Sequence, residues 1–431
     1  MSSSVDVRPK KTETGPEDGV TQPEPQVGQT LQRHTSSGVM TPRSLFHTDP
    51  VTSYRRHCVL LNNGVWMPMI GLGICKGDAA VVGSVVEAAV TAGYRYIETS
   101  HAAHNEAAIG NALRQVIAAG KVKREDLFIA TKLPCEGNRR EKVRKYLRSS
   151  LKKLQVPFVD LYLVHFPVYE RAFKKNRHRL HAAGAAADEP HHLQSQQPQM
   201  DHLGRPKGSD SPESPGTEDE SAAHLAGAAD VTDILETWRG MEDAANMGMT
   251  RSIGLCNFNK EQVARILRAA TIKPAALQVE CHAYLNQSDL LKFCKEHSIC
   301  LTAYAPLGSP GGSRHHYNAT TTVTATGTPS KEEKVHEGPH HSDLLHHEVL
   351  RKMADTYKKT PAQILIRWLL QRGIVALPRA TCPNHIRENI EVFDFELSQE
   401  DVETLSGLDK NLRLFTYNVH GLPNRAEYPF K

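Results

Sequence analysis

Three ionisable residues lie near the ends of three successive predicted strands. These residues are Glu98, Lys132 and His165. A carboxylate and an ammonium can form an ion pair, and an imidazole exchanges protons near neutral pH. Together the three side chains could move a proton to or from a molecule bound at the strand ends.

The residues around these positions resemble the aldo-keto reductase family. The stretch 93–106, Gly-Tyr-Arg-Tyr-Ile-Glu-Thr-Ser-His-Ala-Ala-His-Asn-Glu, resembles the signature in which a strand ends Asp-Thr-Ala and a catalytic tyrosine follows. Glu98 replaces the Asp, and Ala103 stands where that tyrosine, the family's proton donor, is expected. Lys132 in Phe-Ile-Ala-Thr-Lys-Leu and His165 in Asp-Leu-Tyr-Leu-Val-His-Phe-Pro match two further catalytic positions. The resemblance therefore implies catalytic roles for Glu98, Lys132 and His165 without the usual phenol.

Three histidines are candidates to replace the absent acid. His165 would face a bound carbonyl from the fourth strand. His104 directly follows the position of the expected tyrosine and His101 lies two residues before it, so a local backbone shift could bring either inward. Losing a positioned general acid typically costs about 10²- to 10⁴-fold in rate, so catalysis would be weakened rather than abolished. Alternatively, Glu98 and Lys132 persist only as a structural ion pair.

Further motifs resemble the family's nicotinamide site. They are Ser-Ile-Gly-Leu-Cys-Asn-Phe at 252–258, Leu-Gln-Val-Glu-Cys-His at 277–282 and Ala-Tyr-Ala-Pro-Leu-Gly at 303–308. By this resemblance Asn257 and Gln278 hold the nicotinamide carboxamide, and the ring of Tyr304 stacks on the nicotinamide.

A fourth motif, Leu-Pro-Arg-Ala, resembles the family's contact with the adenosine 2′-phosphate. Its Arg379 can bind a phosphate with two hydrogen bonds, which favours NADP(H) over NAD(H). Ala380 and His385 replace family residues that also hold the phosphate, so this clamp is weakened. Glu388 and Asn389 match the positions that contact adenine.

Short β-branched runs alternate with helical patterns, which is typical of βα units and a parallel sheet. The predicted strands are 69–74, 96–99, 127–132, 159–165, 252–257, 276–280, 301–305 and 374–377. Eight such strands predict a (β/α)8 TIM barrel, preceded by a β-hairpin that turns at Asn63 and Gly64. The pair Gly71 and Gly73 lacks the third glycine of a dinucleotide fingerprint, so no Rossmann site is predicted.

Three segments are poor in large apolar residues and are predicted to be disordered or low in complexity. They are a tail at 1–55 and insertions at about 171–228 and 310–343, within a barrel domain at 56–431. Removing them leaves about 280 residues, the size of one α/β barrel. Both insertions follow strands on the face where barrels carry active sites, so they could cover the mouth or bind a protein partner. The alternative is that they are tolerated expansions.

Composition excludes several classes of protein. The net charge of the 431 residues is only +4 with both signs interspersed, so no nucleic-acid surface is expected. No run approaches the length of a membrane span. Eight cysteines without a Cys-x-x-Cys pair indicate a reducing, cytoplasmic location rather than a disulfide framework. The histidine pairs lack the acidic or cysteine partners of a metal site, so no metal is predicted.

Three functions remain open. The first is an NADP(H)-dependent oxidoreductase that acts on a small carbonyl or alcohol with altered acid chemistry. The second is an NADP(H)-binding pseudoenzyme that senses redox state, which the loss of the tyrosine would favour. The third is a scaffold that has lost the cofactor, which the retained cofactor motifs disfavour.

Overall fold

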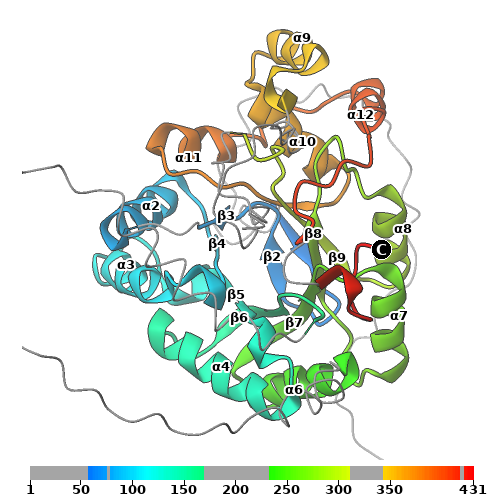
Figure 1. Cartoon of the computed structure of the whole chain (residues 1–431). Coiled ribbons are helices and arrows are strands. Elements are labelled where there is room, and N and C mark those ends of the chain that lie inside the picture. The colour runs from blue at the N-terminus through cyan, green and yellow to red at the C-terminus, as the bar shows by residue number, and fades with distance from the viewer. Residues whose placement is uncertain (1–56, 75–77, 169–232, 311–342, 418–421) are drawn as a thin grey trace, which may run out of the picture. The chain divides into compact units, whose positions relative to one another are not determined.

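The computed structural model describes residues 57–74, 78–168, 233–310, 343–417 and 422–431. The predicted tail at 1–55 and the two insertions lie outside these ranges, apart from residues 310 and 343. Figure 1 shows the described strands at the centre of a ring of helices.

Eight parallel strands form one sheet in which each strand pairs with its neighbour along the chain. They are β3 (Leu72–Gly73), β4 (Tyr96–Glu98), β5 (Phe128–Leu133), β6 (Val159–Val164), β7 (Thr250–Cys256), β8 (Ala276–Glu280), β9 (Cys300–Tyr304) and β10 (Val375–Leu377). A parallel bridge between Ile70 and Ala376 joins the first strand to the last. The predicted (β/α)8 barrel is confirmed, with every carboxyl end of a strand at the same face.

A two-stranded hairpin closes the opposite face. β1 (Cys58–Leu60) pairs antiparallel with β2 (Trp66–Pro68), and the turn has Gly64 at a positive φ of 81°. Asn62 donates to the carbonyl of Pro274 before β8, and Asn63 donates to the carbonyl of Arg251 at the start of β7. The predicted hairpin is therefore confirmed, and it covers the amino-terminal ends of the strands.

The helices surround the strands. They are α2 (Ala79–Ala92), α3 (Glu106–Ala118), α4 (Arg140–Leu154), α6 (Ile234–Asn246), α7 (Lys260–Ala269), α8 (Ser288–Glu296), α9 (Glu348–Tyr357), α10 (Pro361–Gln371), α11 (Pro383–Ile390) and α12 (Gln399–Ser406). In α4, Val143, Leu147 and Leu154 are buried at helical spacing while basic residues face outward. No helix in these described segments is both long and apolar enough to cross a membrane.

The alternation of side chains along each strand decides which residues reach the inside of the barrel. On β5, Phe128 and Ala130 pack inside with Tyr96, while Thr131 points outward and donates to Glu106 on α3 at 2.9 Å. Lys132 therefore points inward. Gly71 is required for closure, because a Cβ there would lie 2.6 Å from the ring of Tyr96. The close packing against Tyr96 is therefore sufficient to explain why position 71 is a glycine, and no dinucleotide fingerprint is needed.

Candidate active site

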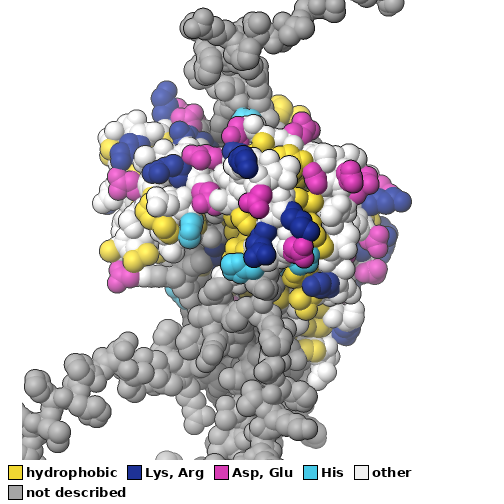
Figure 2. All heavy atoms as spheres, turned by 90° about the horizontal axis from the view of Figure 1, so that it is seen from above, with side chains coloured by type: hydrophobic (Ala, Val, Ile, Leu, Met, Phe, Trp, Pro, Cys, Tyr) yellow, Lys and Arg dark blue, Asp and Glu magenta, His cyan; other side chains and the backbone are white. Residues whose placement is uncertain are grey.

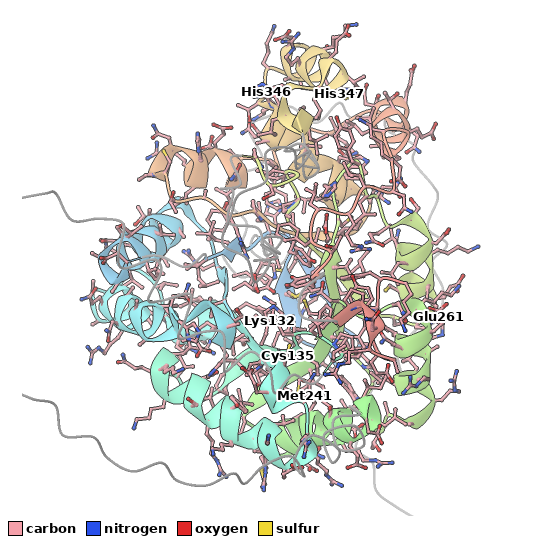
Figure 3. The ribbon with its side chains drawn as sticks, viewed as in Figure 1. Lys132, Cys135, Met241, Glu261, His346 and His347 are labelled. Atoms are coloured by element: carbon pink, nitrogen blue, oxygen red, sulfur yellow. The ribbon has the colours of Figure 1, made fainter. Side chains whose placement is uncertain are left out.

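Glu98 and Lys132 form a buried ion pair at the carboxyl ends of β4 and β5. The side chain of Glu98 is 8% exposed and that of Lys132 is 7% exposed, and Glu98 Oε1 contacts Lys132 Nζ. Lys132 Nζ also donates to the carbonyl of Thr99 at 3.3 Å. Figure 3 shows Lys132 near the centre of the ring of helices. The predicted pairing of these two residues is therefore present inside the barrel mouth.

Burial changes the acidity of Lys132. Loss of solvent lowers the pKa of its ammonium to about 8, while Cys256 opposes this change and the positive charge of Arg379 adds to it. An ammonium has three N–H groups. Glu98 and Thr99 accept two of them, and the structure gives Nζ no third acceptor among the described residues. Lys132 can thus remain protonated at neutral pH with one donor available to a bound molecule.

His165 follows β6 and behaves differently from the sequence expectation. Burial, followed by the charges of Lys132 and Arg379, lowers the pKa of its imidazole to about 3. At neutral pH the ring is therefore uncharged, whereas the sequence suggested an imidazole that titrates near working pH. A neutral ring can donate one hydrogen bond to a carbonyl oxygen, but it is a poor source of a proton.

His104 lies on an exposed turn. The 3-10 turn η2 (His101–Ala103) precedes it, and His104 has a positive φ of 56°. Ala103 is partly buried, and its amide donates to the carbonyl of Ser100. The neighbouring His101 lies 3.6 Å from Glu106, on the outer side of β5. The exposure of His104 contrasts with the burial of Glu98 and Lys132, so the structure does not place it in their buried pair.

The predicted nicotinamide residues converge on one hydrogen-bonded cluster. Asn257 follows β7 with a positive φ of 62°, and its Nδ2 donates to the carbonyl of His165 at 3.0 Å. The hydroxyl of Tyr304, at the end of β9, donates to Asn257 Oδ1 at 2.8 Å. The thiol of Cys256 donates to Gln278 Oε1 at 3.7 Å, but the buried Nε2 of Gln278 has no hydrogen-bond partner among the described residues. An amide group of a ligand could satisfy this Nε2.

The predicted adenosine residues lie in two places. Arg379 is exposed, and its stem lies beside Gly73, where a Cβ would be 3.4 Å from both Arg379 Cγ and Glu98 Oε2. Glu388 and Asn389 lie on α11. Glu388 Oε1 accepts a hydrogen bond from Thr360 at 2.5 Å, and Asn389 is buried. Arg379 is thus close to the ion pair, while the other two belong to the surrounding helices.

Sequence reasoning assigned no role to Glu280, which is fully buried at the end of β8. Its carboxylate accepts the backbone N–H groups of Leu414 and Phe415 at 2.6 and 3.0 Å. Phe166, which follows β6, contacts the carboxyl-terminal tail, where it packs with Tyr417, Tyr428 and Phe430. An ionisable residue within an apolar strand was the available signal for Glu280.

The described histidine pair lies away from this cluster. Figure 3 shows His346 and His347 by α9, at the rim of the molecule, and His347 Nδ1 accepts the amide of Val349 at the start of that helix. The face in Figure 2 carries interspersed acidic and basic side chains over its described part. The histidine pair therefore lies outside the hydrogen-bonded cluster described above.

Comparison with known proteins identifies the family. The aldo/keto reductase family model matches residues 71–410. Aldo-keto reductase family 1 member A1 of Gallus gallus is 35% identical over 376 residues, which are 86% of this chain and 95% of that protein. Aldo-keto reductase family 1 member C1 of Homo sapiens is 36% identical over 383 residues, 86% of this chain and 97% of that protein.

Solved structures agree with these matches. An aldo-keto reductase of Bombyx mori in complex with NADP superimposes with a TM-score of 0.64 at 29% identity, covering 86% of this chain and 98% of that one. The aldose reductase of Schistosoma japonicum gives a TM-score of 0.62 at 32% identity, with 87% and 98% covered. The chain belongs to the aldo/keto reductase family.

Proposed function

We propose that the protein is an NADP(H)-dependent oxidoreductase that reduces the carbonyl of a small aldehyde, ketone or quinone, or oxidises the corresponding alcohol, and that Lys132 is its proton donor. The observation that carries this proposal is the buried Lys132 ammonium, which retains one N–H without an acceptor among the described residues. Family membership and the NADP bound to the Bombyx mori relative support the choice of cofactor.

The residues of the mouth fit a nicotinamide. The unpartnered Nε2 of Gln278 can donate to a carboxamide oxygen, and Asn257 lies beside it with its amide already oriented by Tyr304 and His165. The ring of Tyr304 offers a surface for stacking. Arg379 would meet the 2′-phosphate, and the nearby helix α11 brings Glu388 and Asn389 for the adenine. When bound, the nicotinamide supplies or accepts a hydride.

The chain's own residues handle the proton. Negative charge develops on a carbonyl oxygen during reduction, and a nearby ammonium stabilises that charge. Lys132 then releases a proton from Nζ to this oxygen and recovers one from water. Glu98 holds Nζ in place and favours the charged ammonium. Neutral His165 can donate a hydrogen bond to the same oxygen. Neither His104 nor the imidazolium form of His165 is needed for this scheme.

The second candidate function is an NADP(H)-binding redox sensor. Ala103 favours it, because a methyl group occupies the position of the family's catalytic phenol. A sensor would use the same cofactor residues and differ only in lacking turnover.

Binding and turnover measured together separate these functions. NADPH is titrated into the full chain, with quenching of intrinsic fluorescence as the signal, and turnover is then followed on a panel of aldehydes and quinones. We expect binding with turnover in the unmodified protein, and binding without turnover in Lys132→Met. Lys121→Met, at an exposed pair with Glu87, is the matched control and should retain both. Binding without turnover in the unmodified protein would support the sensor, and no binding would exclude both functions.

A further inference from the structure

Glu280 joins the barrel mouth to the carboxyl-terminal tail. It lies on the same side of β8 as Gln278, two residues further toward the mouth. Its Oε1 accepts the amide of Leu414 at 2.6 Å and lies 3.0 Å from Nε2 of His282, and its Oε2 accepts the amide of Phe415 at 3.0 Å. The guanidinium of Arg413 lies 3.9 Å from Oε2. Among the described residues, the hydrogen-bond and ion-pair partners of this carboxylate belong to the tail or are His282.

These contacts are strong because Glu280 has no exposure to solvent. A buried carboxylate requires hydrogen bonds to replace its hydration. Two of the hydrogen-bond donors that replace water are the backbone N–H groups of Leu414 and Phe415, so the carboxylate holds the backbone of the tail rather than a mobile side chain. Glu280 therefore fixes the path of the tail at residues 414–415.

The fixed tail in turn contacts the predicted nicotinamide platform. The ring of Phe415 meets the ring of Tyr304 edge-on, with centroids 5.7 Å apart and an interplanar angle of 76°. The Tyr304 hydroxyl donates to Asn257 at 2.8 Å. A continuous set of contacts thus runs from Glu280 through Phe415 and Tyr304 to Asn257.

We propose that Glu280 is a positioning residue for the cofactor, which acts by holding Phe415 against Tyr304 and so fixing the surface on which the nicotinamide stacks. This inference rests on the proposed function, since it assumes that Tyr304 and Asn257 meet a nicotinamide.

A second anchor of the tail provides a matched control. Glu427 Oε1 lies 2.8 Å from Nη1 of Arg265, and the Glu427 carbonyl accepts from Gln262 Nε2 at 2.9 Å, both on α7. This anchor holds Tyr428 and Phe430, which contact Phe166. It supports the aromatic wall of the mouth, and among the described residues Tyr428 and Phe430 make no direct ring contact with Tyr304, unlike Phe415.

The test compares Glu280→Gln with Glu427→Gln in the full chain. In Glu280→Gln an NH2 group replaces one of the two acceptor oxygens, so one of the two backbone N–H groups faces a donor and loses its hydrogen bond. We expect the amides of Leu414 and Phe415 to exchange with deuterium at least about tenfold faster. The Kd for NADPH should rise about tenfold, equivalent to ~1.4 kcal/mol. Glu427→Gln should leave this Kd within about twofold of the unmodified value.

Three results would overturn the proposal. One is unchanged exchange at 414–415 in Glu280→Gln, and another is faster exchange with an unchanged Kd. The third is an equal rise in Kd for both variants. Should Glu280→Gln not fold, Phe415→Leu leaves the carboxylate contacts in place, and the same tenfold rise is expected of it. Failure of the unmodified protein to bind NADPH would instead refute the proposed function itself.

Discussion

Replacing Lys132 with Met should destabilise the protein through the carboxylate that it leaves behind. The Met side chain is close in volume to the stem of Lys132, so the cavity contribution is small. Glu98, however, is buried, and apart from Lys132 no described residue donates a hydrogen bond to its Oε1. Removing one partner of such a buried pair typically costs about 3–5 kcal/mol. At about 2–4 °C per kcal/mol for a domain of this size, the melting temperature should fall by about 6–20 °C.

The dependence on pH identifies the cause. In Lys132→Met, Glu98 takes up a proton more readily in the folded state, where its charge is buried, than in the unfolded state. The folded state then binds more protons, so the free energy of unfolding decreases as pH rises. The loss relative to the unmodified protein should therefore be largest at neutral pH and shrink in mild acid.

Urea denaturation at several pH values, followed by circular dichroism, measures both effects. The double change Glu98→Met with Lys132→Met removes both charges and should recover most of the loss, because apolar replacements of buried pairs are often neutral. A single variant within about 1 kcal/mol of the unmodified protein at neutral pH would refute the reasoning. So would a double variant less stable than the single one.

Three further predictions concern activity. The value of kcat/KM for carbonyl reduction should fall above about pH 8, because the lowered pKa of Lys132 leaves it deprotonated there; a profile flat to pH 9.5 would exclude Lys132 as the acid. Ala103→Tyr should raise reductase activity by up to about 10²- to 10⁴-fold, measured as kcat with and without Glu98→Asp; no gain in either variant would show that the pocket does not accept a phenol. Arg379→Met should reduce the preference for NADPH over NADH by about tenfold in Kd, or ~1.4 kcal/mol, and equal affinities in the unmodified protein would contradict the assigned phosphate contact.

Elements governed by local pattern were predicted closely. The strand at Ala276–Glu280, for example, has the predicted bounds. The first strand is shorter than predicted, at Leu72–Gly73. The residues before it make single hydrogen bonds to the last strand at the barrel closure, where Gly71 donates to the carbonyl of Ala376 and Met69 accepts the amide of Ala376. Hydrophobic alternation reports burial, but it does not report how far a backbone ladder extends.

Properties that depend on distant neighbours were not predictable. The low pKa of His165 follows from burial beside Lys132 and Arg379, which come from other strands. The exposure of His104 depends on how the turn after β4 packs against the rest of the barrel. The role of Glu280 required knowing where a tail more than a hundred residues later returns, as its bond to Leu414 shows.

The hairpin under the barrel also bears on how the chain can fold during synthesis. Its Asn62 bonds to Pro274, 212 positions later in the sequence. The apolar side chains of Leu61, Val65 and Met67 are buried inside the barrel floor. A ribosome-bound chain that ends before β8 therefore exposes them without a docking surface. The first element of the barrel domain to be synthesised is therefore among the last to dock, and truncated products should be prone to aggregation.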